Sequence, residues 1–504
     1  MRHTAIRRAP PAKSLVGRTF TMLSSSTAVS WLLLCAFGYA AAGILYTRSF
    51  KKSLEDYITA RNSQSAIATI LTLMASTLGA WILFAPAQAA TWGGLAAIIG
   101  YALGAMSPRI AMIPLGRRMR ELIPNGHTLT EFLIARYGRP MYGLALLIMV
   151  FYLFIAMSAE VTAVGKLVRL LAPVPIWVTA IVVVGATLIY TSYGGLRASI
   201  FTDRVHMIVI VPLLLFLVAL GWYTAGGAMP TIEGLRARAP RLLDLSDPAG
   251  VKAGFTFFVA ILLTGLFHQG NWQRIYAARD SRTMRNGFLL GGLMVGPFIF
   301  LMGLFGLAFV GLAPGGDSSV ALFSVLIPHA SLWLALLLIP LGLGLVMSSS
   351  DTAISAISSL IAVDLGRLLP KASSATMMRL ARGLIFVLAI PVIVVAAQGY
   401  SVLYLFLLAD LLCSAAAFPV FYGLFSKRHD GFAAMTGTLF GLVAGLSLFP
   451  LPGAKPEHLL ESFLAAALVP VVVILIMRPL RRSMHEFDFA KLGASVRLLD
   501  EDGA

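Results

Sequence analysis

The most regular feature of the sequence is a series of apolar runs of about twenty residues, recurring from Ala28 to Met477. Each run is long enough to cross about 30 Å of hydrocarbon as a helix. With glycine, proline and charged clusters taken as breaks, the pattern predicts about thirteen spans, near 28–48, 64–90, 92–114, 141–171, 175–194, 205–225, 251–272, 286–312, 330–362, 380–398, 400–424, 431–450 and 459–478. The alternating segments of about ten residues that build membrane β-barrels are absent. The pattern therefore predicts an all-α integral membrane protein.

Composition agrees with this pattern. Of the 504 residues, 58% are hydrophobic and 12% are charged, whereas a soluble protein is about one quarter charged. The net charge of +17 comes from Lys and Arg in short connections and not from a basic face on a soluble domain, so we expect the lipid bilayer and no nucleic acid as a partner. Cys35 and Cys413 lie inside apolar runs, which excludes a disulfide framework and a cysteine metal cluster.

The basic residues also predict the orientation of the chain. The clusters that fall on one side are Arg48/Lys51/Lys52, Arg117/Arg118/Arg120, Arg197/Arg204, Arg274/Arg279/Arg282/Arg285, Arg367/Lys371, Lys427/Arg428 and Arg478/Arg481/Arg482. That side is cytoplasmic by the positive-inside rule. We therefore expect a multi-pass protein of the cytoplasmic (inner) membrane, with the N-terminus outside and the C-terminus inside.

Two features oppose this orientation. Arg2, Arg7, Arg8, Lys13 and Arg18 precede the first span, and Arg236, Arg238 and Arg241 make the connection at 226–250 basic although it is placed outside. A cleaved signal peptide ending near Ala40–Ala42 is an alternative interpretation of the first span.

Three acidic residues lie inside predicted spans, namely Glu160, Asp351 and Asp410. A charge at the centre of a bilayer costs at least several kcal/mol, so such an acid needs a partner, a proton or a water-filled cavity. Each acid is a candidate for binding a solute or a proton. The alternative is a structural role in which a hydrogen-bonded acid holds two helices together.

Polar side chains and helix breaks then point to an ion site. Residues 348–352, Ser-Ser-Ser-Asp-Thr, place five oxygen-bearing side chains in an apolar helix, and hydroxyl oxygens suit a small hard cation. The span 64–90 is weakened by Gly79 and Pro86, and the span 251–272 by Gly265 and Gly270. Unwound backbone at membrane depth is tolerated where it lines a cavity. Two interrupted spans five helices apart are typical of an inverted-repeat transporter.

At these residues the chain resembles the sodium:solute symporter family, which includes proline, sugar, sialic acid, pantothenate and urea transporters. The resemblance runs from about Lys52 to Gly431. It rests on Tyr190-Thr191-Ser192-Tyr193-Gly194-Gly195-Leu196-Arg197 with Thr202-Asp203, on Met347-Ser348-Ser349-Ser350-Asp351-Thr352 with Asp364, and on Gln273-Arg274. It implies a ten-helix core at 51–430 in two inverted halves, about 64–225 and 251–424. The segment 1–50 would hold an N-terminal tail and one extra helix, and 431–504 two accessory helices and a short tail.

The resemblance also implies site residues. The sodium site would use the carbonyl groups of Ala75, Leu78 and Leu345 and the hydroxyl groups of Ser348 and Ser349, with Asp203 on the cytoplasmic exit of the ion. The family's substrate residues do not transfer to this chain. The candidates for binding the solute or a proton are therefore Thr77, Trp81, Glu160, Thr264, Gly265, Gln269, Asp351 and Asp410.

The predicted function is sodium-coupled symport of a small polar solute by alternating access. The solute would be amide-like or urea-like, an amino acid, an organic anion or a cation. We expect no enzyme, because His206 and His268 lack convergent partners in the sequence, and no cofactor beyond the coupling ion. Proton-coupled symport remains an alternative. A membrane sensor working with a separate partner is another, since only about 26 residues follow Arg478 and these are too few for a kinase domain.

Overall fold

The computed structural model describes residues 22–48, 53–329, 331–368, 373–452, 457–480, 486–494 and 496. In these ranges the chain is helical, and its one β-type pairing is an isolated bridge between Gln64 and Ala278. The basic N-terminal residues up to Arg18 and the acidic end of the tail at 500–502 lie outside the described residues. The prediction of an all-α membrane fold is confirmed.

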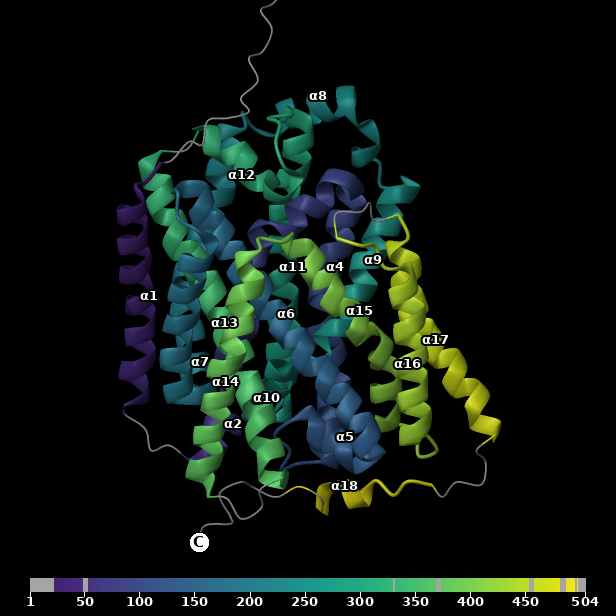
Figure 1. Cartoon of the computed structure of the whole chain (residues 1–504). Coiled ribbons are helices and arrows are strands. Elements are labelled where there is room, and N and C mark those ends of the chain that lie inside the picture. The colour runs from purple at the N-terminus through teal and green to yellow at the C-terminus, as the bar shows by residue number, and fades with distance from the viewer. Residues whose placement is uncertain are drawn as a thin grey trace, which may run out of the picture.

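The helices follow one another in a single bundle (Figure 1). They are α1 (Ser25–Thr47), α2 (Leu54–Ile58), α3 (Ala66–Ala75), η1 (Ala80–Leu83), α4 (Ala85–Leu122), α5 (Leu129–Tyr137), α6 (Arg139–Leu171), α7 (Ile176–Thr224), α8 (Ala228–Arg238), η2 (Pro240–Leu243), α9 (Pro248–Gly265), α10 (Gln269–Ala277), α11 (Ser281–Leu312), η3 (Ser318–Val320), α12 (Ala321–Leu326), η4 (Ile327–His329), α13 (Leu332–Leu368), α14 (Ser374–Ala397), α15 (Val402–Phe421), η5 (Tyr422–Leu424), α16 (Gly431–Leu448), α17 (Leu459–Leu480) and α18 (Ala490–Ala494).

Many of these helices begin where the sequence supplies a capping side chain. The side-chain oxygens of Ser24, Ser65 and Asp280 accept backbone amides at the starts of α1, α3 and α11. Thr128 and Glu131 form a reciprocal capping box at the start of α5. Such caps satisfy amides that have no partner inside the helix, which matters most where lipid offers none.

The predicted count of thirteen spans is not confirmed. Eleven helices among the described residues are long and apolar enough to cross a membrane, and α3 is shorter. Two of the eleven, α4 and α7, pass through a glycine with positive φ, Gly94 at +63° and Gly195 at +58°. A Cβ at Gly195 would lie 2.5 Å from the backbone oxygen of Tyr57, so this close approach requires glycine.

The break in α7 differs from the predicted loop. The sequence placed a connection at 195–204, between the spans 175–194 and 205–225, because Arg197 and Arg204 interrupt the apolar pattern. The structure keeps 196–204 helical. Arg197 pairs with Asp56 at 2.8 Å, and Arg204 lies over the ring of Phe201. The two charges therefore lie on a helix near the end of the bundle, where they reach partners at its surface.

Two helices are interrupted as predicted. The first pair is α3 and η1, separated at residues 76–79, and the second is α9 and α10, separated at residues 266–268. The short helix α5 follows α4 at one end of the bundle, and α12 follows α11 at the opposite end (Figure 1). The two halves of the core thus carry matching elements in opposite orientation, which is the arrangement of an inverted repeat. The exact limits of the two halves stay a prediction.

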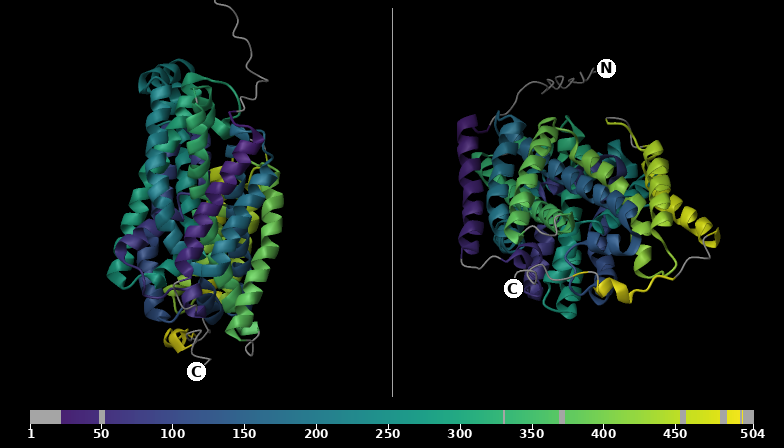
Figure 2. Two further views of the ribbon diagram at one scale, coloured as in Figure 1. Left: turned by 90° about the vertical axis from the view of Figure 1, so that its left-hand side faces the viewer. Right: turned by 60° about the horizontal axis from the view of Figure 1, so that its bottom comes forward.

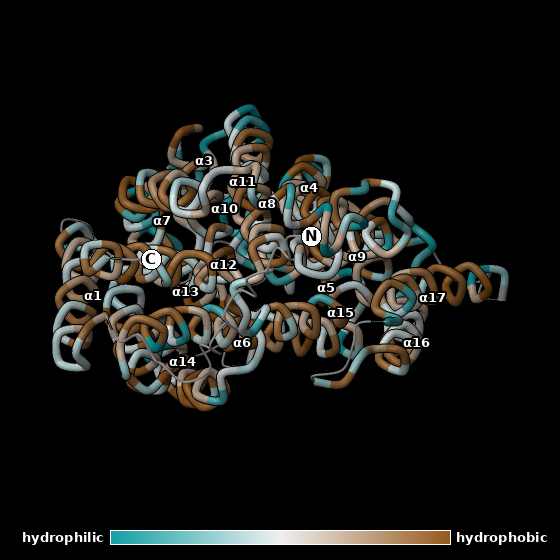
Figure 3. The backbone as a smooth tube through the Cα atoms, turned by 90° about the horizontal axis from the view of Figure 1, so that it is seen from above, coloured by the Kyte–Doolittle hydropathy of each residue, from teal (hydrophilic) through white to brown (hydrophobic). Residues whose placement is uncertain are grey.

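The extra helices lie outside this core. Helix α1 lies at one edge of the bundle against α7 (Figure 2), and α16 and α17 pack on each other and on α15. Seen from the end that holds α8 and α12, α1 and α17 lie at opposite edges (Figure 3). Inside, α4 packs on α9 and α11, while α6 packs on α13 and α15. The breaks in α3 and α9 lie inside the bundle, because Thr77 and Leu78 at the first and Leu266 and Phe267 at the second are buried.

Basic residues gather at one end of the bundle. A single hollow is lined by Arg61, Arg117, Arg120, Arg282 and Arg285, so two of the basic connections that the sequence placed on one side meet there. Helix α8, with its own basic residues, lies at the opposite end (Figure 1).

Candidate functional site

The break after α3 frees backbone groups in the middle of the bundle. The Thr77 amide bonds the Met74 carbonyl at 3.0 Å, and the Gly79 amide bonds the Thr77 carbonyl at 3.0 Å. These short-range bonds replace the regular pattern of an α-helix, and Gly79 is extended, with φ −87° and ψ 178°. The Thr77 hydroxyl donates to the Leu73 carbonyl at 2.6 Å and covers part of the helix end. Helix α3 therefore stops at a site where its last carbonyl groups are available to other partners.

Four of the five predicted sodium ligands converge at this break. The Ser348 hydroxyl lies 3.0 Å from the Ala75 carbonyl oxygen and 3.1 Å from the Leu345 carbonyl oxygen. The Ser349 hydroxyl lies 3.1 Å from the same Leu345 oxygen. Leu78, the fifth, lies fully buried in the break itself. Carbonyl and hydroxyl oxygens gathered in this way are the hard ligands that suit a small alkali cation.

Asp203 contacts α3 at Thr72, about one helical turn before Ala75. It is fully buried on α7 and pairs with Arg274 of α10, whose Nη2 lies 2.9 Å from Asp203 Oδ2. Thr72 of α3 also donates to Asp203, and Arg274 bonds Thr352 of α13 at 2.9 Å. Four helices thus meet at one buried ion pair. Breaking such a pair would leave an uncompensated charge, which typically destabilises a protein by 3–5 kcal/mol.

Asp351 lies beside this pair and binds both halves of α7. Its carboxylate accepts the hydroxyl groups of Tyr190 at 2.7 Å, Ser199 at 2.8 Å and Thr202 at 2.9 Å. Tyr190 precedes the break at Gly195, and the other two follow it. Asp351 on α13 therefore holds together the two segments of α7 that lie on either side of the break at Gly195.

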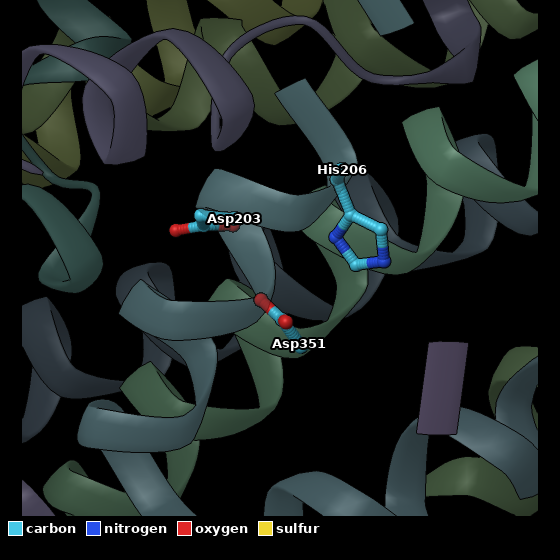
Figure 4. A group of neighbouring side chains, drawn as sticks. All are labelled: Asp203, His206 and Asp351. Carbon is cyan, nitrogen blue, oxygen red and sulfur yellow. The ribbon is translucent and has the colours of Figure 1, made fainter. Parts of the chain in front are cut away.

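His206 completes a cluster with these two acids. Figure 4 shows the side chains of Asp203, His206 and Asp351, and one atom of each lies within 4.8 Å of the others. Neither nitrogen of His206 has a hydrogen-bond partner among the described residues, and Tyr39 meets the imidazole ring edge to face at 4.7 Å. Arg274 and the hydroxyl groups of Thr72, Tyr190, Ser199 and Thr202 already contact the acids of this cluster.

A cavity of ≈ 100 Å³ lies next to the α3 break, on the side of Ser349. Of the predicted solute-binding residues, six line it: Thr77, Trp81, Glu160, Thr264, Gly265 and Asp410. It takes side chains from α4, α6, α9, α13 and α15 as well as from the break. The cavity is therefore placed where both interrupted helices and the helices between them can contact one solute.

Glu160 links the cavity to the break. Its Oε2 accepts the Trp81 amide at 3.3 Å, and its side chain lines the cavity together with Ser349. Asp410 lies across the cavity, where the Thr264 hydroxyl of α9 lies 3.2 Å from its backbone oxygen. Both acids are buried, with exposed fractions of 4% and 6%.

The structure does not bring Gln269 or Asp351 to this cavity. Gln269 donates to the His127 carbonyl at 3.0 Å and accepts the Leu129 amide at 3.1 Å, which holds α10 against the connection before α5. The carboxylate of Asp351 is already hydrogen-bonded to hydroxyl groups of α7, as described above. The polar groups of Gln269 and Asp351 therefore serve contacts between segments of the protein and do not line the cavity.

His127 itself forms a buried charge cluster outside the spans. Its Nε2 lies 2.6 Å from Glu55 of α2, and its Nδ1 lies 3.1 Å from Glu131 of α5. Burial opposes the charge of His127, but hydrogen bonds and charges from the two glutamates outweigh it and raise the pKa of His127 from 6.5 to about 9. Burial likewise opposes the charged forms of Glu55 and Glu131, yet His127 lowers the pKa of both carboxyl groups below 4.5. The cluster, in which Glu55 also pairs with Arg61 at 2.8 Å, therefore ties α2 to α5.

Sequence reasoning missed several residues that line the cavity. Arg109 of α4 is the most informative, because it is a buried cation inside an apolar span; its Nη1 bonds the Ala105 carbonyl at 2.9 Å, and its Nη2 bonds the Thr77 hydroxyl. Tyr101, Tyr152, His268 and Asn271 also line the cavity. An arginine after Ser107-Pro108 inside the predicted span 92–114 was the signal that could have found this site.

The chain is similar to known membrane transport proteins. A family model described as "Sodium:solute symporter family" matches residues 57–441. The spermidine transporter DUR31 of Candida albicans is 26% identical over 418 residues, which cover 81% of this chain and 77% of that protein.

Two further relatives match over less of their length. The urea-proton symporter DUR3 of Oryza sativa subsp. japonica is 24% identical over 406 residues, or 72% of this chain and 56% of that protein. The sodium/pantothenate symporter of Escherichia coli is 26% identical over 278 residues, or 51% of this chain and 55% of that protein. The chain thus spans a little over half the length of these two relatives.

A solved structure has a similar fold. It is a substrate-bound outward-open state of a Na⁺-coupled sialic acid symporter, with a TM-score of 0.71 and 18% sequence identity. The match covers 91% of this chain and 99% of that chain.

Proposed function

Because the chain belongs to the sodium:solute symporter family, we propose that it uses a sodium gradient to carry a small polar solute across the cytoplasmic membrane. The observation that carries this proposal is the meeting of the Ala75 and Leu345 carbonyl groups with the hydroxyl groups of Ser348 and Ser349 at the α3 break. Small polar solutes are also what the relatives named above transport.

In the proposed mechanism, the sodium site at the α3 break and the solute cavity act together because they share Ser349. Sodium would be held by oxygens of α3 and α13, and the solute by the adjacent cavity. Ser349 lines the cavity and is one of the proposed ligands. A cation at the break would therefore draw α3 and α13 together beside the solute. Solute binding is then stronger with sodium present, which is the thermodynamic meaning of coupling.

The proposed orientation follows from charge. The end lined by Arg61, Arg117, Arg120, Arg282 and Arg285 would face the cytoplasm. Asp203 would then lie on the path by which sodium leaves. With α1 running from the other end, the N-terminal side would lie outside and α18 inside (Figure 1).

The proposal is tested with purified protein in detergent. Its thermal unfolding would be followed in sodium chloride and in potassium chloride at equal ionic strength, because a bound ion stabilises the folded state by mass action. We expect a higher Tm in sodium for the wild type and no sodium effect for Ser348→Ala. Equal Tm values of the wild type in the two salts would contradict sodium binding.

Proton coupling is the second candidate function. It is favoured by the urea-proton symporter among the relatives and by the buried cluster of Asp203, His206 and Asp351. Proteoliposomes discriminate between the two. Solute uptake driven by an inward sodium gradient at equal pH supports sodium coupling, and uptake that needs only an inward proton gradient supports the alternative.

A further inference from the structure

The solute cavity carries more negative than positive side chains. Glu160 and Asp410 contribute two carboxyl groups, and Arg109 contributes the one guanidinium group among the lining residues. Arg109 forms no ion pair with an acid among the described residues. Desolvated charges are tolerated when they are paired. A solute that brings one positive charge would favour the ionised form of both carboxyl groups and so balance the cavity.

Glu160 also occupies the backbone that would receive a solute carboxylate. Transporters with interrupted helices commonly use the freed amides at the break to bind the anionic group of a substrate. Here the Trp81 amide donates to Glu160, and the Ala80 amide is within hydrogen-bonding reach of the same carboxyl group. A Cβ at Gly79 would lie 1.7 Å from Glu160 Oε1, so the carboxylate rests directly on this backbone. The protein supplies its own carboxylate, and the solute does not need one.

An aromatic wall faces these acids. The Trp81 ring stacks on Tyr101 at 5.7 Å and meets Phe406 at 5.7 Å, and all three rings line the cavity. The Trp81 Nε1 group is already bonded to the Thr77 carbonyl at 3.0 Å, which fixes the ring. Aromatic faces attract cations, most strongly where water is excluded. The aromatic rings and the two acids therefore both favour a positively charged solute.

We propose that the transported solute is a small organic cation, whose protonated amine or amidine group lies between Glu160, Asp410 and the aromatic wall of Trp81, Tyr101 and Phe406. This inference rests on the proposed symport function and names the class of its solute. The cavity is small, at ≈ 100 Å³, which restricts the size of the part of the solute that is held there. Arg109, whose Nε has no hydrogen-bond partner among the described residues, would face a hydrogen-bond acceptor of the solute.

The test compares acetamidinium, acetamide and acetate, which have nearly the same size and shape and differ in charge. Each is added to the purified full chain in sodium chloride, and the rise in Tm with concentration gives an apparent affinity. We expect acetamidinium to bind at least tenfold more tightly than the other two. Butylamine and butanol form a longer pair for the same comparison, and the protonated butylamine should be the tighter ligand.

Variants connect this selectivity to the cavity. Asp410→Asn keeps the size of the side chain but removes its charge, so the preference for acetamidinium should fall at least tenfold. Phe406→Leu leaves both acids in place and should weaken acetamidinium binding several-fold with little effect on acetamide. Glu233→Gln, an exposed acid on α8, is the control and should bind as the wild type does. If Asp410→Asn does not fold, Phe406→Leu and the wild-type selectivity still decide.

The outcomes separate this inference from the symport proposal. Equal binding of acetamide and acetamidinium, or preferred binding of acetate, would overturn the organic cation while a Ser348-dependent effect of sodium would leave sodium coupling intact. Selective binding of acetamidinium with no effect of sodium would support the solute class and overturn the coupling ion.

Discussion

Replacing His127 by asparagine should lower the stability of the protein in a strongly pH-dependent way. His127 lies between Glu55 and Glu131, at 2.6 Å and 3.1 Å. Asparagine keeps a hydrogen-bonding group but removes the positive charge, so Glu131 loses its ion pair with His127 while Glu55 keeps its ion pair with Arg61 at 2.8 Å. The rise in the pKa of His127 from 6.5 to about 9 corresponds to about 3 kcal/mol of stabilisation from the protonated form.

The direction of the pH dependence follows from the pKa values. Because the folded pKa of His127 is raised, its contribution is complete below about pH 6.5 and is lost as the pH rises through about 9. The pKa values of Glu55 and Glu131 are lowered, so their contributions are present above about pH 4.5 and are lost on acidification. The wild type should therefore lose stability between pH 6.5 and pH 9 in excess of what the variant loses.

The assay is thermal unfolding in detergent, followed by tryptophan fluorescence across this pH range. We expect the Tm of His127→Asn to lie several degrees below that of the wild type near pH 6.5, and the two values to approach each other near pH 9. His458→Asn, at an exposed histidine before α17, is the matched control and should follow the wild type at every pH. Parallel curves for the wild type and His127→Asn would refute the assignment of a protonated His127.

Three further predictions concern the site and the topology. Gly79→Ala should reduce solute uptake at least tenfold in a folded protein, because the new Cβ would displace the Glu160 carboxylate while the backbone φ of −87° suits alanine; uptake equal to that of the wild type would contradict the position of Glu160. Tyr190→Phe removes one hydroxyl donor from Asp351 and should lower the free energy of unfolding by about 1–3 kcal/mol, measured by chemical denaturation; no change would mean that Asp351 does not need this donor. In a background without Cys35 and Cys413, an impermeant thiol reagent on intact cells should label Ser246→Cys and not Ser281→Cys, and the reverse pattern would invert the proposed orientation.

The sequence was most informative where local chemistry alone decides the structure. The break after α3 could be predicted because Gly79 and Pro86 weaken one apolar run, and the break after α9 because Gly265 weakens another. The positions of Ser348 and Ser349 could be predicted because the resemblance fixes them relative to Asp364. These features depend on neighbours along the chain.

The rest of the site depends on contacts between distant segments. Asp351 and Asp410 are both acids in apolar spans, yet Asp351 is surrounded by hydroxyl groups of α7 and Asp410 faces the cavity. Nothing in their local sequence separates these roles. Arg109 was overlooked because the basic cluster that begins at Arg117 follows closely, although Arg109 is buried.

Sodium binding at the α3 break is the central claim, and direct binding of radioactive sodium to the purified protein tests it. The wild type is compared with the double variant Ser348→Ala/Ser349→Ala, which removes two proposed ligands without adding volume, and with Ser358→Ala. Ser358 lies on the same helix but bonds the Ile354 carbonyl of its own helix at 2.8 Å. The account predicts saturable binding to the wild type and to Ser358→Ala, and binding at least tenfold weaker to the double variant, equivalent to about 1.4 kcal/mol or more. Equal sodium affinity of the wild type and a folded double variant would contradict it.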